Sequence, residues 1–125
     1  MILDTNALSA FLAEDAALLA LLGNTPEMHL PTIVLGEYRF GLKASRKRRE
    51  LLPLLDALEA DCIVLVVDAM TALEYAEVRS ELKAAGTPIP GNDLWIAALA
   101  RQHALEIATN DAHFDCVAGV TRKGW

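Results

Sequence analysis

The chain has 125 residues, of which 54% are hydrophobic and 22% charged, and its formal net charge is −6. This length suits a single domain, residues 1–125, and the composition can fill a hydrophobic core, which excludes intrinsic disorder. No apolar run approaches the roughly 18 residues that span a bilayer, and no basic segment with an apolar run opens the chain, so we expect a cytoplasmic protein without a signal peptide or membrane span.

Short apolar runs alternate with helical patterns along the chain, which indicates βαβ units around a parallel sheet. The predicted strands are Met1–Asp4, Met28–Leu30, Ile63–Val67, Glu106–Thr109 and a short fifth at Val117–Thr121. The first predicted helix is capped by Thr5 or Asn6, and the next two cover 15–22 and 32–44. A fourth helix is capped by Ser45 and has an apolar stripe over 51–58. The last two helices cover 69–85 and 92–103. We therefore predict an α/β fold, a three-layer α/β/α sandwich with a mainly parallel sheet of four or five strands.

Four carboxylates, far apart in the sequence, can converge at one edge of this sheet. Ligands of parallel sheets collect at the carboxyl ends of the strands. Asp4 ends the first strand, Asp111 follows the fourth, and Glu37 and Asp93 lie on helices that can pack over the same edge. Each aspartate also has a purely structural interpretation. Asp4 can be a strand-end or capping residue, Asp93 an N-cap or a charge favoured by the helix dipole, and Asp111 a turn residue.

Glu37 has the strongest physical argument for a functional role. Its neighbours one helical turn away include Ile33, Val34 and Phe40, so we expect its carboxylate to be at least partly buried. A buried carboxylate needs a cation, hydrogen bonds or a metal. Oxygen ligands without Cys or His select Mg²⁺ or Mn²⁺ over zinc. Such a site hydrolyses phosphodiesters, with Asn6 and Thr109 as supporting hydrogen-bond groups.

At these residues the sequence resembles the PIN-domain nucleases, and within them the VapC-type toxins. The resemblance rests on Ile2–Asn6, Val34–Gly41, Asn92–Ala98 and Ala108–Phe114, in order across nearly the whole chain. It implies a PIN-like fold, an Mg²⁺- or Mn²⁺-dependent endoribonuclease acting on RNA, a homodimer, and inhibition by a cognate antitoxin protein.

The resemblance also implies roles for individual residues. Asp4, Glu37 and Asp93 match the family's metal-binding and catalytic acids, and Asp111 is the best match for the fourth, with Asp115 as its rival. The supporting groups by resemblance are Thr5, Asn6 and Thr109.

Six of the eleven cations form a basic segment within eleven residues, namely Arg39, Lys43, Arg46, Lys47, Arg48 and Arg49. They can hold RNA phosphates, or they are the solvated surface of a junction between two helices. The leucine-rich stripes near 16–22 and 51–58 fill the protein's own core or leave a groove for an antitoxin helix.

The remaining cysteines, histidines, tryptophan and cations are expected to have structural or solvent-exposed positions without a catalytic role. Cys62 and Cys116 are expected to be free thiols, and Trp95 is expected in the core. The three histidines, His29, His103 and His113, are given no catalytic role, and Arg79, Lys83 and Arg101 are expected on solvated helix faces.

Three other functions compete with the RNA-cleaving toxin. They are a PIN-like nuclease acting on DNA, an RNA-processing enzyme that is not a toxin, and a non-catalytic module whose acids dock a basic partner. A nucleotide-binding or receiver domain fits poorly, because no Gly-rich phosphate loop follows the first strand.

Overall fold

The computed structural model describes residues 1–125 and has one sheet of five parallel strands, in the order β3-β2-β1-β4-β5. The strands are β1 (Ile2–Leu3), β2 (His29–Pro31), β3 (Ile63–Leu65), β4 (Ile107–Ala108) and β5 (Arg122–Lys123). The predicted parallel α/β fold is confirmed.

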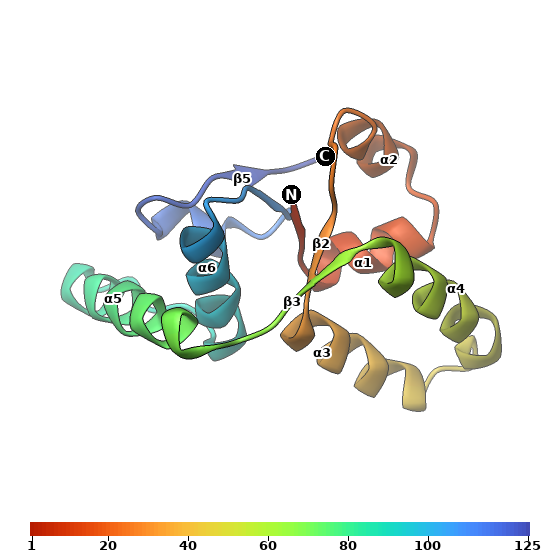
Figure 1. The fold of residues 1–125 in the computed structure, drawn as a ribbon, viewed down its shortest axis with the longest axis horizontal. Coiled ribbons are helices and arrows are strands. Elements are labelled where there is room, and N and C mark those ends of the chain that lie inside the picture. Colours follow the sequence, from red (N-terminus) through yellow and green to blue (C-terminus); the bar gives the residue numbers. More distant parts are fainter.

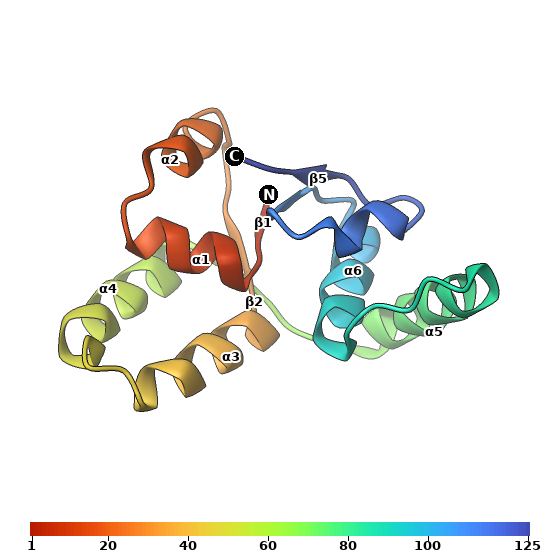
Figure 2. The same cartoon turned by 180° about the vertical axis from the view of Figure 1, so that it is seen from behind.

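Helices cover both faces of the sheet. Figures 1 and 2 show α1 to α4 grouped on one side of the twisted sheet and α5 with α6 on the other. Their bounds are α1 (Thr5–Leu12), α2 (Ala16–Leu22), α3 (Thr32–Lys43), α4 (Arg48–Asp61), α5 (Ala69–Ala85) and α6 (Gly91–His103), and a 3-10 helix, η1, covers Ala112–Cys116.

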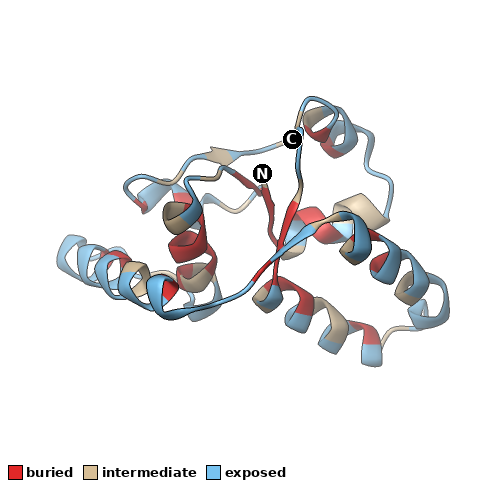
Figure 3. Ribbon diagram, in the orientation of Figure 1, coloured by how far each residue is buried: buried red, intermediate tan, exposed pale blue.

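The core lies around the central strand β1 and its neighbour β4. Ile2, Leu3, Ile107 and Ala108 have no exposed surface, as expected of strands covered on both faces. Figure 3 shows buried residues concentrated there and on the inner faces of the surrounding helices. This packing makes a rigid base for the residues that follow β1 and β4.

The predicted fifth strand at Val117–Thr121 is wrong in position. The chain first forms η1, and Val117 then packs into the core outside any strand. Gly119 adopts a φ of 78°, a left-handed conformation that glycine accepts without strain, and the strand forms only at Arg122–Lys123. Apolar content therefore marked a buried turn rather than a strand.

Two predicted helix starts are also wrong. Asp4, rather than Thr5 or Asn6, caps α1, because its Oδ1 accepts the Ala7 backbone N–H at 2.8 Å. Helix α4 begins at Arg48, three residues after Ser45, whose Oγ instead accepts the Lys47 backbone N–H at 3.1 Å.

Several smaller expectations can be compared with the structure. Cys62 and Cys116 are free, and burial raises the pKa of the Cys62 thiol to about 11. Trp95 is half-buried and stacks on Tyr75, with ring centroids 3.9 Å apart. Arg101 is not on a solvated face, because Glu74 and Glu81 bind its guanidinium.

No single helix is long and apolar enough to cross a membrane; by length and composition, only α1 and α2 taken together reach that threshold, and the pair is bent by 111°.

Candidate active site

The site begins where β1 and β4 end side by side. Leu3 pairs with Ala108, so the next residues, Asp4 and Thr109, leave neighbouring strands at the same edge. Asp4 is only 5% exposed and Thr109 is fully buried. The Thr109 side chain hydrogen-bonds Asp4, and its hydroxyl accepts the Asp111 backbone N–H at 2.9 Å. The two strand ends are thus joined through polar side chains.

Helix α6 brings a second acid to the same edge. Asp93 lies in the first turn of α6 and does not cap it, since the N-cap is Pro90. Ligand atoms of Asp93, Asp111 and His113 lie within 4.8 Å of one another, which makes a group able to hold a metal ion. His113 Nδ1 lies 3.0 Å from Asp93 Oδ2 and 3.0 Å from Asp111 Oδ1.

Glu37 approaches from α3 and is held by two donors. The Thr5 hydroxyl donates to Oε2 at 2.7 Å, and the Asn92 side-chain amide donates to Oε1 at 2.6 Å. The carboxylate therefore joins α3 to both α1 and the start of α6. Because each oxygen keeps a free lone pair, Glu37 can still accept a proton or a ligand.

The prediction that Glu37 is partly buried is wrong. The residue is exposed, and so is Phe40, which is 77% accessible although it belonged to the supposed apolar face. The core-facing residues of α3 are Val34, Leu35 and Leu42. Glu37 lies at the margin of that face, where hydrogen bonds rather than burial fix its position.

The charges of these acids act on one another. We call Asp4, Glu37, Asp93 and Asp111 the acidic cluster. Burial raises the pKa of Asp4, hydrogen bonds from Thr109 and Ala7 oppose this, and the charges of Asp93 and Asp111 raise it further. Burial likewise raises the pKa of Asp93; hydrogen bonding to His113 opposes this, and the charges of Asp111 and Glu37 add to it.

The donor set fits a hard divalent cation. The four carboxylates come from separate elements, and they lie close enough that, after burial as the larger cause, the charges of neighbouring acids raise the pKa values of Asp4 and Asp93. A divalent cation prefers such oxygens and removes the repulsion between them. The acidic cluster is therefore suited to metal binding.

Other residues singled out in the sequence lie elsewhere. Asp115 forms two hydrogen bonds with Arg122, at 2.7 and 3.0 Å, and this ion pair lowers its pKa. Asn6 is exposed and forms no side-chain hydrogen bond with the acidic cluster. Thr5 and Thr109, in contrast, both contact cluster acids.

The basic segment is not uniform. Arg39 is paired with Asp56 and Glu59 on α4, so its charge is already engaged. The remaining cations of the segment, Lys43 and 46–49, are exposed at the corner between α3 and α4, with no carboxylate within ion-pair distance.

Two residues at the site were missed in the sequence. His113 follows Asp111 by two positions, and this Asp-x-His spacing was the only local signal in the sequence. In the structure, Asp111 Oδ1 accepts the His113 backbone N–H at 2.9 Å. Asn92 was passed over because its contact with Glu37 joins residues 55 positions apart.

Comparisons with known proteins agree with this geometry. Residues 1–120 match the PIN domain family. Ribonuclease VapC5 of Mycobacterium tuberculosis is 36% identical, over 75% of this chain and 72% of that protein. The tRNA(fMet)-specific endonuclease VapC of Salmonella typhimurium is 28% identical, over 82% of this chain and 78% of that protein.

Solved structures extend the comparison to three dimensions. A crystal structure of VapBC2 from Rickettsia felis, bound to a DNA fragment from its promoter, contains a chain with a TM-score of 0.86 and 26% identity, covering 99% of this chain and 97% of that one. The chain therefore belongs to the PIN-domain family and, within that family, to the VapC-type ribonucleases.

Proposed function

We propose that this protein is the toxin of a toxin–antitoxin pair, an Mg²⁺- or Mn²⁺-dependent endoribonuclease that hydrolyses RNA phosphodiester bonds at the acidic cluster. The observation that carries the proposal is the convergence of four carboxylates from four elements, with Asp4 and Asp93 each responding to the charge of their neighbours. The names of the relatives support ribonuclease activity as the class of reaction.

The roles of the residues follow from their surroundings. Asp4, Asp93 and Asp111 would supply oxygen ligands to the cation, which when bound lowers the pKa of a water molecule and offsets charge on the phosphate. Glu37 is held at both oxygens by Thr5 and Asn92 and orients the attacking water, accepting its proton on Oε1 or Oε2. His113 lies between two acids and keeps their oxygens together.

Cleavage of RNA tests the proposal directly. Purified protein is incubated with labelled RNA and with DNA of the same sequence, with Mg²⁺, Mn²⁺ or EDTA. RNA cleavage that requires the metal is expected. Cleavage of DNA alone favours the DNA nuclease, and metal-independent binding of a basic partner without cleavage favours the non-catalytic module. Activity that survives EDTA contradicts the proposed chemistry.

The basic segment would guide RNA toward the site. Its free cations continue from the end of α3, the helix that carries Glu37. Exposed cations without carboxylate partners are available to RNA phosphates, whereas the acidic remainder of the surface repels them. Arg39 is excluded from this role because Asp56 and Glu59 already bind it.

An apolar groove between α1 and α4 would receive the antitoxin. Two adjoining cavities of about 430 and 320 Å³ share Leu12, Glu14 and Leu54, and are otherwise lined by residues such as Phe11 and Leu51. Leu54 is 47% exposed, and an amphipathic helix would cover it. One related structure, VapBC-5 from Mycobacterium tuberculosis, is of a member of the VapBC family of toxin–antitoxin systems, which supports a protein partner. Leu54→Lys is expected to weaken co-purification with the antitoxin and leave RNA cleavage unchanged.

The homodimer would use the segment that joins β3 to α5 together with the first turns of α5. Val66, Met70 and Leu73 are each more than half exposed, and β3 is an edge strand of the sheet. Exposed apolar side chains gathered at a sheet edge are typical of a contact between chains. Met70→Lys with Leu73→Lys is expected to give a monomer by light scattering, and an unchanged mass contradicts this placement.

A further inference from the structure

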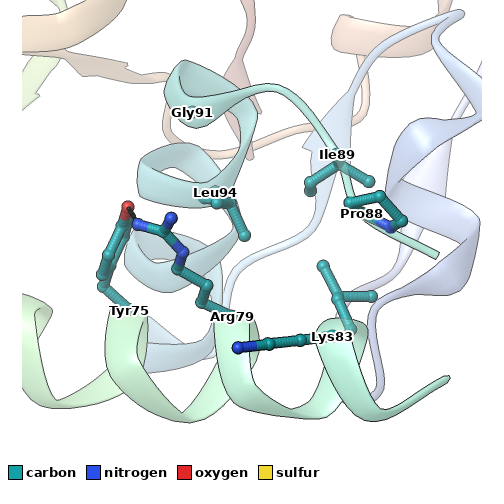
Figure 4. Close-up of a pocket in the computed structure, with 8 residues that line it drawn as sticks. Tyr75, Arg79, Lys83, Pro88, Ile89, Gly91 and Leu94 are labelled. Carbon is teal, nitrogen blue, oxygen red and sulfur yellow. Dashed lines mark hydrogen bonds between the residues drawn. The ribbon is translucent and has the colours of Figure 1, made fainter. Parts of the chain in front are cut away.

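A pocket unrelated to the carboxylates lies between α5 and α6. Its volume is about 440 Å³, within the range of small-ligand sites. Figure 4 shows Tyr75, Arg79 and Lys83 along α5, with Ile89 and Leu94 across from them. The three α5 residues are spaced by four, so they lie on one face of the helix. The pocket thus has a cationic side and an apolar side.

The two cations of this pocket have no acidic partner. Arg79 and Lys83 are exposed, and no carboxylate lies within ion-pair distance of either. Arg101, on the facing helix, is in contrast bound by two glutamates of α5. In a chain with a net charge of −6, two unpaired cations that line one cavity attract an anionic ligand.

Tyr75 fixes the direction of one of these cations. Arg79 Nη1 donates to the Tyr75 hydroxyl at 2.9 Å, and the guanidinium carbon lies 5.9 Å from the ring centroid. Trp95 stacks on Tyr75 and holds it in place. A planar guanidinium held beside an apolar wall offers a surface on which a nucleobase can pack, and it keeps N–H groups free for a phosphate.

The pocket adjoins the acidic cluster along the chain. Gly91 lines the pocket, the next residue, Asn92, donates to Glu37, and Asp93 belongs to the cluster. A polynucleotide whose scissile phosphate lies at the cluster would therefore place a neighbouring nucleotide across the first turn of α6. Nothing in the sequence pattern had assigned Arg79 or Lys83 a role beyond solvation.

We propose that this pocket binds one nucleotide of the RNA substrate next to the scissile phosphodiester. Arg79 and Lys83 bind its phosphate, the base packs against Leu82, Ile89 and Leu94, and Tyr75 positions Arg79. The proposal rests on the proposed ribonuclease function, since it names a part of the substrate. Each nucleotide of RNA carries both an anionic phosphate and a planar base, so RNA supplies a ligand for the cationic side and for the apolar side of the pocket.

Trp95 provides a direct readout. The chain has two tryptophans, and Trp125→Phe leaves Trp95, stacked behind the pocket, as the only one. A non-cleavable 2′-O-methyl RNA trinucleotide is titrated into this variant in EDTA. We expect a saturable change in Trp95 fluorescence. Arg79→Ala with Lys83→Ala should weaken the apparent Kd roughly tenfold or more and, because one phosphate contact is lost, lower the slope of log K against log salt by about 0.7.

Three variants separate a specific role from a general one. Arg79→Lys keeps the positive charge but lacks the planar guanidinium, so it should only partly restore RNA binding. Tyr75→Phe removes the hydroxyl that holds Arg79 and should weaken RNA binding by a few fold. Lys123→Ala removes a cation of β5 that Glu106 already engages, and should leave the titration unchanged.

The outcomes distinguish this proposal from the proposed function. RNA cleavage by the wild type, with no Trp95 response and an unchanged KM for Arg79→Ala/Lys83→Ala, overturns the pocket and leaves the nuclease intact. A Trp95 response without metal-dependent cleavage of any RNA supports a nucleotide site and overturns the nuclease. Loss of antitoxin binding alone in the double variant assigns the pocket to the protein partner and overturns the proposal.

Discussion

The acidic cluster and the basic segment differ in how their charges are held. Every cluster acid accepts a hydrogen bond from a defined donor, such as Thr5, Asn92 or the Ala7 backbone, and two of them are held by His113. The cations after Arg39 have no partner and project into solvent. Chemistry needs fixed geometry and so requires contacts between distant parts of the chain, whereas attraction of a polyanion requires only accessible charge.

Removing one cluster acid should have the largest effect. Asp93→Asn keeps the size of the side chain but removes a charge on which the cation site depends. We expect the single-turnover rate of RNA cleavage to fall by roughly a thousandfold or more, because metal-assisted stabilisation is worth several kcal/mol. Glu50→Gln, at an exposed acid on α4, is the matched control. A rate for Asp93→Asn within a few fold of the wild type would show that cleavage does not depend on this acid.

The donors around Glu37 should matter less than the acids themselves. Asn92→Ala removes the amide that donates to Oε1, so Glu37 loses half of its support. We expect kcat to fall by about 10- to 100-fold, the usual effect of losing a group that orients a ligand. Asn24→Ala, at an exposed asparagine far from the site, should leave the rate unchanged. Equal rates for the two variants would mean that Glu37 needs no such positioning.

These positioning contacts also mark the limit of what the sequence could predict. Asp4 and Asp111 were predictable, because each follows a buried strand and parallel strands end at one edge. The capping role considered for Asp4 is confirmed, since Asp4 caps α1. Asp111, considered as a turn residue, caps the 3-10 helix η1. A structural role and a place in the cluster are therefore compatible.

The contacts that were missed are those that cross the fold. The environment of Glu37 was misjudged because helical spacing shows which residues share a face, but not whether that face meets the core. His113 and Asn92 lie near predicted acids, yet their partners are 20 and 55 residues away. The fifth strand was misplaced because a buried turn and a short strand share the same apolar content.

Neutralising the basic segment should produce a modest, salt-dependent effect. Arg48→Ala with Arg49→Ala removes two unpaired cations, so the affinity for an RNA of about twenty nucleotides should fall a few fold at low salt. The difference should disappear at high salt. Arg39→Ala, measured in the same binding assay, should have little effect because Asp56 and Glu59 already engage that charge. A larger loss of RNA affinity for Arg39→Ala than for Arg48→Ala with Arg49→Ala would mean that Arg39, and not the unpaired cations, binds the RNA.

The smallest expected effect is on stability without metal. The pKa of Asp4 is raised in the folded protein, so the fold binds this proton more tightly than the unfolded chain does. The stabilisation that this provides is present at low pH and is lost as the pH rises through the folded pKa. In EDTA, Asp4→Asn should raise the Tm by about 2 to 5 °C at neutral pH, and the gain should shrink on acidification. If the rise in Tm caused by Asp4→Asn became larger at low pH, the pKa of Asp4 would be lowered, not raised, by folding.

If four particular carboxylates form one cation site, aspartate variants should differ in metal binding according to whether their side chain belongs to that site. Mn²⁺ binding is measured by calorimetry for the wild type, Asp111→Asn and Asp115→Asn. Asp115 is engaged by Arg122, whereas Asp111 shares His113 with Asp93. We expect Asp111→Asn to lose most of the affinity for Mn²⁺ and Asp115→Asn to bind it like the wild type. The opposite order, or no Mn²⁺ binding by the wild type, would contradict a cation site formed by these four carboxylates.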